Sequence, residues 1–358
     1  MNFLAGIIST PHGPGTGAFV VLEHLIKAWP AHADPLLVIA PRNSPLARLC
    51  VEHAVECVDL PTRRDRLVEN VPRMPTTAPL LRKCRVVHAW HSRGFELAWL
   101  AGRRLGVPTA ATMHDHPDCR THGILRRRLI RLSAARLDRI ACVSNAVREA
   151  WRSVREEKRL VVIHNGLVDQ APARAPTGGG PVRVGFLGMY AAWKGFDVVA
   201  RWIRETPAEH TQWRLYGEPE AALRPAAAAL AAQRSASVRL CGTCRPDTIF
   251  SEIDVLVHAS LEFDPFPTVL IEAARAGIPV VASARGGAGE IVIHADTGFL
   301  FRPDDPATGL AHLRRLLADA SLRAAMGAAA RKRFVRHFTV QRMVEDYRSF
   351  WSELGGAP

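Results

Sequence analysis

The chain has 358 residues, of which 48% are hydrophobic and 23% are charged, and this composition predicts a globular protein of about two domains. It excludes wholesale disorder, collagen-like repeats and small scaffolds that depend on disulfides. The net charge is +13, and the excess lies mostly in residues 1–170, which hold 25 basic and 15 acidic side chains against 22 and 19 in the remainder. Two interpretations of this excess are open. The first half binds an anionic partner, such as a membrane surface, a phosphorylated substrate or nucleic acid, or its basic side chains only keep the surface well solvated.

Cysteine usage and apolar runs indicate the compartment. Seven cysteines at irregular spacing argue against a disulfide framework and for a reducing environment. Cys241 and Cys244 have the CxxC spacing, but a zinc ribbon needs a second such pair, so we interpret them as ordinary thiols. No apolar run approaches the ~18–20 residues of a membrane span, and the N-terminal run is typical of a buried strand rather than of a signal peptide. We expect a cytoplasmic protein.

Short apolar runs alternate with amphipathic stretches through the first 168 residues. The runs predict strands at Phe3–Ile8, Leu36–Ala40, Val86–Ala89, Thr109–Met113, Arg139–Val143 and Leu160–Ile163. Helical periodicity lies between them, at Gly17–Trp29, Phe95–Leu105 and Arg126–Arg136. Apolar runs separated by helices are typical of buried parallel strands in βαβ units.

Residues 169–181 interrupt this pattern, because the sequence DQAPARAPTGGGP has the composition of a linker. A second series of strands follows, at Val182–Leu187, Trp213–Tyr216, Val238–Leu240, Val255–Ala259, Pro279–Ala282 and Gly298–Phe301. Helical stretches fill the gaps, at Glu218–Gln233, Thr268–Ala276 and Pro306–Arg333.

We therefore predict an α/β fold with two Rossmann-like, mostly parallel-sheet domains, residues 1–168 and residues 182–335. They are expected to face a central cleft, with ligands at the carboxyl ends of the strands. The remaining segment, residues 336–358, carries an amphipathic helix at Val340–Leu354 that we expect to pack back on the first domain.

A glycine-rich loop follows the first predicted strand, and Gly13–Ala18 formally matches the dinucleotide fingerprint. The match is weak, because the insert Ser9–Gly13 lengthens the turn, and Arg42 follows the second strand where an acidic residue is typical. An NADP site and a plain turn stay open as interpretations. We favour a loop that lines a phosphate or a sugar at a helix N-terminus, through Gly15, Thr16 and Gly17.

The segment His258–Glu290 carries the strongest chemical signal. A strand ends in a polar loop that holds Asp264, and a helix begins near Thr268 with Glu272 in its first turns. We expect this helix start, formed by Phe266, Pro267, Thr268 and Val269, to line the ligand. Backbone N–H groups at such a start are unpaired and attract an anion, whereas carboxylates accept hydrogen bonds from hydroxyls. Together they predict a nucleotide-sugar site, with the diphosphate on the helix end and hydroxyls on the two carboxylates.

This segment resembles glycosyltransferase family 4, whose pattern is E-x7-E within a stretch like E-G-F-P-x-x-x-x-E-A-x-A-x-G-x-P-V-V-A. Other pieces resemble family motifs in the expected order: Ala111–Asp115, Leu137–Asn145, Val162–Gly166, Phe186–Gly195, Gly286–Glu290 and Asp296–Gly298. The resemblance covers roughly residues 1–335 and implies retaining enzymes of the GT-B fold. This chain departs from the pattern in two places, with Asp264 where the family has Glu and Met189 where it has Arg.

The resemblance implies a role for each matching residue. Lys194 contacts the donor phosphates, Glu272 binds the ribose hydroxyls, Asp264 binds the transferred sugar, and His114 lies across the cleft near the donor hexose and the acceptor. Gly188 and Met189 belong to the phosphate loop, while Gly217, Gly242 and Thr243 frame the nucleobase. Each residue also has a plain structural alternative: a solvated lysine, a helix-terminal acid, a loop acid or a core histidine.

The implied reaction is transfer of a sugar from a nucleotide sugar, UDP- or GDP-linked, to a glycan or polyprenyl-linked acceptor with retained configuration. We expect no cofactor and no metal, because a DxD motif is missing and Asp304-Asp305 sits in a proline-flanked turn. Two alternatives stay open. One is a catalytically silent sugar-nucleotide-binding partner of a related transferase, and the other is an NADP-dependent oxidoreductase.

The stretch Arg120–Arg139 has seven arginines and one acid, interleaved with leucine and isoleucine. It predicts a basic amphipathic helix in the acceptor-side domain. Two interpretations stay open: an exposed face whose arginine stems cover the core, or peripheral attachment to an anionic membrane such as the inner face of the plasma membrane. Nucleic acid is not an expected partner, because no nucleic-acid-binding motif accompanies the charge.

Overall fold

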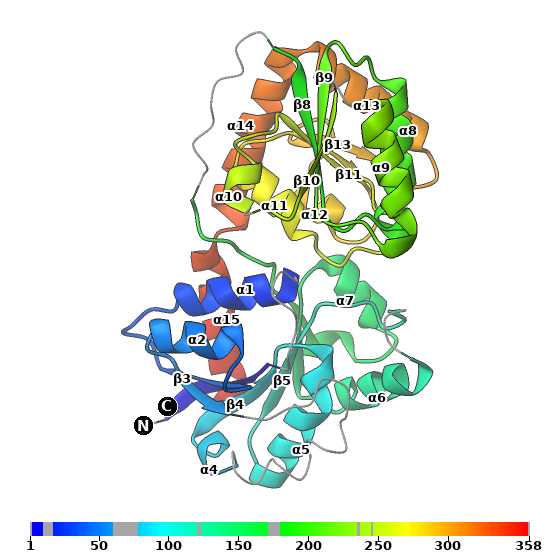
Figure 1. The fold of residues 1–358 in the computed structure, drawn as a ribbon. Helices are drawn as coiled ribbons and strands as arrows, with labels where there is room; N and C mark the ends of the chain where they lie inside the picture. The colour runs from blue at the N-terminus through cyan, green and yellow to red at the C-terminus, as the bar shows by residue number, and fades with distance from the viewer. Residues whose placement is uncertain are drawn as a thin grey trace. The chain divides into compact units, whose positions relative to one another are not determined.

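The computed structural model describes residues 2–9, 17–59, 78–119, 123–170, 180–234, 237–244 and 246–356. The chain divides into two compact units (Figure 1). The N-terminal unit comprises Met1–Val168 together with Val340–Pro358, and the C-terminal unit comprises Asp169–Thr339. Most of the predicted linker, residues 171–179, lies outside the described residues.

The described residues of the N-terminal unit form a seven-stranded sheet in the order β3-β2-β1-β4-β5-β6-β7, and all its neighbours pair in parallel. The strands are β1 (Phe3–Ile8), β2 (Leu36–Ala40), β3 (Glu56–Asp59), β4 (Cys84–Ala89), β5 (Thr109–Met113), β6 (Arg139–Cys142) and β7 (Leu160–Val162). Strands β1, β2 and β5 are buried at every position, as expected for strands covered on both faces. The edge strand β3 was not predicted, because its sequence ECVD has no apolar run.

Helices surround this sheet. They are α1 (Gly17–Lys27), α2 (Pro45–Glu52), α4 (Ala78–Leu81), η2 (Ser92–Gly94), α5 (Phe95–Leu105), α6 (Ile124–Ala134), α7 (Asn145–Trp151), η3 (Glu157–Arg159) and α15 (Val340–Gly355). Ser44 and Ser144 cap α2 and α7, and each hydroxyl accepts a hydrogen bond from a backbone N–H in the first turn.

Helix α15 is part of the core of the N-terminal unit. Its buried face carries Val340, Met343, Tyr347, Phe350 and Trp351, which pack into one cluster with residues of β1, β2 and α1. A buried polar chain runs through the same core. The indole N–H of Trp351 donates to Nδ1 of His88 over 3.1 Å, and Nε2 of His88 lies 2.8 Å from the hydroxyl of Thr112, which lies 2.8 Å from the hydroxyl of Tyr347.

The hydrogen bonds of His88 show which ring nitrogen carries the hydrogen. An indole N–H is only a donor, so Nδ1 of His88 accepts and Nε2 carries the hydrogen. Burial, with a smaller contribution from His114, lowers the pKa of His88 to about 3. The imidazole is therefore neutral at physiological pH and serves as a satisfied core group.

The described residues of the C-terminal unit form a six-stranded sheet in the order β10-β9-β8-β11-β12-β13, again parallel throughout. The strands are β8 (Val182–Leu187), β9 (Thr211–Tyr216), β10 (Val238–Gly242), β11 (Val255–His258), β12 (Val280–Ser283) and β13 (Gly298–Phe301). Figure 1 shows α8 (Phe196–Glu205), α9 (Arg224–Gln233) and α13 (Pro306–Ala318) on one face and α11 (Thr268–Arg275) and α14 (Ala320–His337) on the other. The short elements are η4 (Ala192–Lys194), η5 (Ala221–Leu223), α10 (Pro246–Ile249) and α12 (Ala288–Ile291).

Two predicted helices were wrong in extent. The stretch Pro306–Arg333 is two helices, because Asp319 leaves the helical conformation and its carboxylate accepts a hydrogen bond from the N–H of Leu322 as the cap of α14. The stretch Glu218–Gln233 becomes regular helix only at Arg224, because Pro219 forms a bridge with Tyr190. The predicted fold class, two Rossmann-like α/β domains with parallel sheets, is confirmed.

Candidate active site

Loops that follow neighbouring strands of the C-terminal unit contact one another through their backbones. Gly195, after β8, has φ +73°, and a Cβ there would lie 2.0 Å from the carbonyl oxygen of Ala259, after β11. Gly286, after β12, also has φ +73°, and a Cβ there would lie 2.0 Å from the carbonyl oxygen of Asp264. Only glycine fits at both positions, so the glycines allow three loops to meet at the carboxyl edge of the sheet.

An ion pair lies where these loops meet. Nζ of Lys194 is 2.7 Å from Oδ2 of Asp264, and Nε2 of His258 is 3.2 Å from the same oxygen. Asp264 is 7% exposed. Burial alone raises the pKa of Asp264, but the Lys194 ammonium and the His258 ring outweigh it, so the pKa lies below the usual range of an aspartic acid. The carboxylate is therefore ionised and accepts hydrogen bonds only.

Backbone contacts hold both members of this pair. Asp264 pairs with Gly286 as an isolated bridge, and the N–H of Gly287 donates to the carbonyl of Asp264 over 2.9 Å. Lys194 ends the short helix η4, and its ammonium lies 4.4 Å from the ring centre of Trp193. The carbonyl of Trp193 accepts from the N–H of Leu261 over 2.8 Å. The β11 loop is thus joined to the β8 loop at Leu261 and to the β12 loop at Asp264.

The N-terminus of α11 follows the same loop. Pro267 is its capping residue and provides no side-chain cap, so the first N–H groups of the helix have no capping side chain. Phe266 is buried edge-on against the ring of Phe338. Thr268 and Val269 form the first turn and are half-buried, and Glu272, in the second turn, is 9% exposed.

The predicted phosphate-loop and nucleobase residues lie at or just after the carboxyl ends of adjacent strands. The N–H of Gly188, after β8, donates to the carbonyl of Tyr216 at the end of β9, and the N–H of Gly217 donates to the carbonyl of Gly242 over 2.8 Å. Met189 is 45% exposed, and Thr243 is exposed. The structure therefore gathers these positions along the carboxyl edges of β8, β9 and β10.

The remaining predicted residues belong to the N-terminal unit. Gly17 is the first residue of α1, whereas Gly15 and Thr16 lie outside the described residues. His114 follows β5, with its ring centre 5.7 Å from that of Trp90 and 5.8 Å from that of His91. It thus belongs to a cluster of rings at the carboxyl end of that sheet.

Sequence reasoning missed His258 as a site residue. A signal was available, because His258 is the polar last residue of the apolar strand VLVH. The neighbouring Ser260 was missed as well, and its hydroxyl lies 3.2 Å from Nε2 of His258. Both follow the strand that precedes the Asp264 loop, where parallel sheets place ligand-binding groups.

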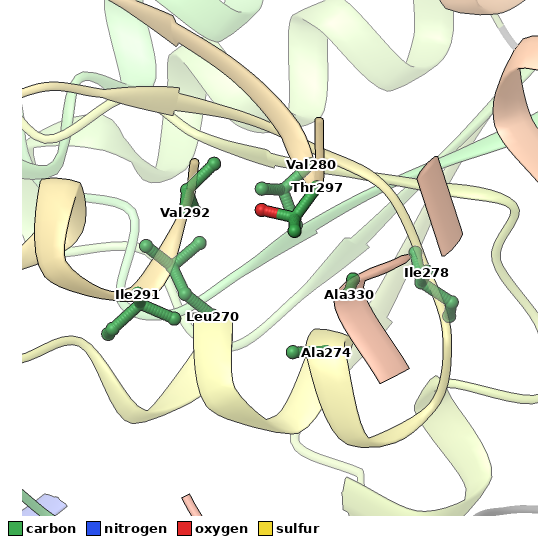
Figure 2. Close-up of a pocket in the computed structure, with 8 residues that line it drawn as sticks. All are labelled: Leu270, Ala274, Ile278, Val280, Ile291, Val292, Thr297 and Ala330. Carbon is green, nitrogen blue, oxygen red and sulfur yellow. The ribbon is translucent and has the colours of Figure 1, made fainter. Parts of the chain in front are cut away.

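A small cavity lies behind α11 in the C-terminal unit (Figure 2). It has room for roughly one water molecule, and its lining is apolar except for Thr297. Its walls are Leu270, Ala274, Ile278, Val280, Ile291, Val292, Thr297 and Ala330. A cavity of this size holds no sugar nucleotide, so it is a packing defect distinct from the Lys194–Asp264 site.

The part of the chain that the structure describes contains no group of three or more His, Cys, Asp or Glu side chains arranged to hold a metal ion. Within the same residues, no helix combines the length and the apolar character that crossing a membrane requires.

Two family models match the chain in succession. The model described as Glycosyltransferase Family 4 matches residues 15–170, and the one described as Glycosyl transferases group 1 matches residues 169–333. The chain belongs to glycosyltransferase family 4. The resemblance found in the D-x7-E segment is therefore confirmed for both units.

Similar known proteins match mostly over short segments. N-acetyl-alpha-D-glucosaminyl L-malate synthase of Bacillus anthracis is 33% identical over 94 residues, which are 26% of this chain and 24% of that protein. Glycogen synthase of Mycobacterium tuberculosis is 40% identical over 79 residues, 22% of this chain and 19% of that protein. D-inositol 3-phosphate glycosyltransferase of Rhodococcus jostii is 26% identical over 74% of this chain and 66% of its own length. The first two matches thus span a quarter or less of those relatives.

Solved structures extend the likeness to the whole fold. Anabaena HepE in complex with UDP-glucose has a TM-score of 0.84 at 19% identity, covering 98% of this chain and 99% of that one. Sucrose-phosphate synthase from Thermosynechococcus elongatus has a TM-score of 0.80 at 18% identity, with 99% of each chain covered. The fold is of the GT-B type.

Proposed function

We propose that this protein is a retaining glycosyltransferase that moves a sugar from a UDP- or GDP-sugar to a glycan or polyprenyl-linked acceptor. The observation that carries the proposal is the Lys194–Asp264 ion pair, held beside the uncapped start of α11 at the carboxyl edge of the C-terminal sheet. The complex of HepE with UDP-glucose supports a UDP-linked donor, because HepE has the same fold.

The two charged groups have different tasks in this proposal. The Lys194 ammonium has three N–H groups and gives one to Asp264, so the others are left for the donor diphosphate together with the first N–H groups of α11. Oδ2 of Asp264 is the oxygen that accepts from Lys194 and His258. We assign the other oxygen, Oδ1, to a hydroxyl of the transferred sugar. Glu272 is assigned to the ribose hydroxyls by the family pattern.

The reaction follows from this placement of charge. The bond between the anomeric carbon and the phosphate oxygen breaks, and the acceptor oxygen bonds to the anomeric carbon from the same face. The acceptor proton passes to the departing phosphate oxygen. Negative charge develops on the diphosphate, where Lys194 and α11 stabilise it. We propose that these groups replace a metal ion, and that His114 serves the donor hexose and the acceptor.

A ligand screen tests the proposal. UDP-, GDP-, ADP- and dTDP-sugars are added to the chelator-treated protein, and melting temperature and slow sugar-nucleotide hydrolysis are measured. We expect one nucleotide family to stabilise the protein by about 2.7 kcal/mol at a hundred times its Kd, and Glu272→Ala to abolish the effect. Binding without hydrolysis or transfer would favour the silent partner, and a requirement for added metal would overturn metal independence. The anomeric proton coupling of the product decides between retention and inversion.

The acceptor proposal rests on the outer face of α6. Ile124, Leu125 and Leu132 are 64%, 80% and 54% exposed. Arg128, which is also exposed, lies between them in the sequence. Exposed apolar side chains beside an exposed arginine fit an anionic membrane, which also carries polyprenyl-linked acceptors.

Flotation with liposomes tests this face. We expect salt-sensitive binding to vesicles that contain phosphatidylglycerol and none to phosphatidylcholine vesicles. Leu125→Ser combined with Arg128→Ser should abolish binding, whereas Val335→Ser, at an exposed apolar residue of α14, should leave it intact. Equal flotation of all variants would overturn the membrane assignment.

A further inference from the structure

His258 belongs to a central strand of the sheet, whereas the carboxylate that it faces belongs to a loop. It is the last residue of β11, which pairs in parallel with β8 and β12, and it is 4% exposed. Asp264 lies six residues further along the chain, in the loop before α11. The strand therefore supplies a fixed point against which the loop carboxylate can be aligned.

The contact between them has a defined direction. Nε2 of His258 lies 3.2 Å from Oδ2 of Asp264 and 3.2 Å from the hydroxyl oxygen of Ser260. An ionised carboxylate only accepts, so Nε2 carries a hydrogen and donates to Asp264. Nδ1 is buried and has no hydrogen-bond partner among the described residues. The carboxylate is thus the charged partner of this ring.

We propose that His258 is a positioning residue for sugar transfer, an inference that rests on the proposed function. When the donor substrate binds, its diphosphate competes with Asp264 for the Lys194 ammonium, so the hold of Lys194 on Asp264 weakens. His258 remains in place because it stands on the sheet. It keeps Oδ2 fixed at that moment, so that Oδ1 stays aligned with the sugar hydroxyl. Support of this kind by a rigid neighbour is what a precise site requires.

Two substitutions separate positioning from support of the fold. His258→Leu keeps the volume and removes the donor, whereas His258→Gln places an amide N–H near the position of Nε2. The measurements are release of UDP from UDP-glucose without acceptor, giving kcat and KM, and the Kd for UDP alone. GDP-glucose and GDP replace them if the ligand screen selects GDP.

We expect kcat/KM of the leucine variant to fall about tenfold to a hundredfold, the range for a hydrogen bond to a charged group. Its Kd for UDP alone should stay near the wild-type value, because UDP lacks the sugar that Asp264 holds. The glutamine variant should recover most of the loss. A parallel loss of UDP affinity, or a glutamine variant as impaired as the leucine variant, would overturn the inference.

Further outcomes are equally decisive. If the leucine variant fails to fold, His258→Asn replaces it, because the shorter amide does not reach Asp264; asparagine and glutamine variants of equal activity would overturn the inference. If the wild type is active and the variants are equally active, the role of His258 is overturned but the proposed function is not. A wild type that neither binds nor hydrolyses any nucleotide sugar overturns the proposed function and the inference together.

Discussion

The two units place a histidine near the end of corresponding strands and use it differently. β4 and β11 are each the fourth strand in their sheet order, and His88 and His258 lie near or at their carboxyl ends. His88 is 0% exposed, and both of its nitrogens meet neutral partners, Trp351 and Thr112. His258 is 4% exposed, and its Nε2 meets the carboxylate of Asp264.

The difference lies in what covers the strand end. Helix α15 packs over β4 and makes the surroundings of His88 part of a core, so the ring is neutral and structural. Loops cover the end of β11, and they bring Lys194 and Asp264 beside His258. Residue type and strand position alone therefore do not separate a core histidine from a site histidine, whereas the charge of its partners does.

The largest effect is expected from Lys194→Ala, which removes the ammonium group that pairs with Asp264 in the C-terminal unit. We expect kcat for sugar release or transfer to fall about a hundredfold to a thousandfold, as for the loss of one group that stabilises a developing charge. The buried Asp264 also loses its counter-ion, which costs about 3–5 kcal/mol of unfolding free energy. Steady-state kinetics and chemical denaturation measure the two effects. Lys332→Ala, at an exposed lysine of α14, is the matched control, and equal kcat values for both variants would contradict the assignment.

In the N-terminal unit, His88 is expected to make the stability of the protein depend on pH. The pKa of His88 is lowered to about 3 from 6.5, so the unfolded chain binds a proton that the folded chain does not. The free energy of unfolding is unaffected by this group above pH 6.5. As the pH falls from 6.5 toward 3, the free energy of unfolding decreases by up to about 1.4 kcal/mol per pH unit. Urea unfolding across that range should show a smaller slope for His88→Gln than for wild type. His53→Gln, at an exposed histidine, should keep the wild-type slope, and an unchanged slope in His88→Gln would refute the reading of His88 as a neutral core group.

A smaller effect is expected where the loops meet. Gly286→Ala adds a Cβ 2.0 Å from the carbonyl oxygen of Asp264 at a φ of +73°. We expect about 1–3 kcal/mol of lost stability and weaker donor binding, because the loop that carries Asp264 must move. Calorimetric titration with UDP-glucose and thermal denaturation measure both. Gly289→Ala is the control, since nothing lies within 4 Å of a Cβ there; equal behaviour of the two variants would show that the contact has no role.

The smallest effect concerns the phosphate loop. Met189 is 45% exposed, so an arginine there can extend without repacking the core. Met189→Arg should lower KM for the nucleotide sugar about twofold to fivefold, the value of an exposed ion pair, with the gain lost at high salt. Met189→Gln adds a polar group without charge and should leave KM unchanged. A salt-independent change would point to packing instead.

Much of the fold was predictable because its signals are local. Buried parallel strands such as β1 and β2 are continuous apolar runs, and helices such as α5 show amphipathic periodicity. Strand β3 was not predictable in this way, because edge strands need less apolar surface. The break at Asp319 was missed since alanine-rich helix continues on both sides, and only the capping contact to Leu322 identifies it.

The candidate site was predictable as a set of residues and not as an arrangement. The resemblance to family 4 assigned roles to Lys194 and Asp264 separately. Their ion pair joins positions 70 residues apart, so it depends on how the β8 and β11 loops meet, and no local pattern encodes that. His258 required the same information. The roles of Glu272 and His114 stay predictions.

The return of α15 has a consequence for synthesis. The chain leaves the N-terminal unit at Val168 and re-enters it at Val340, and the bond from Trp351 to His88 joins residues 263 positions apart. The N-terminal core therefore stays incomplete until the whole C-terminal unit has been translated. Its first 168 residues are expected to expose the apolar surface that α15 covers, which makes them dependent on chaperones during elongation. A fragment that ends at Val168 should aggregate, and a synthetic peptide of residues 340–355 should restore its solubility.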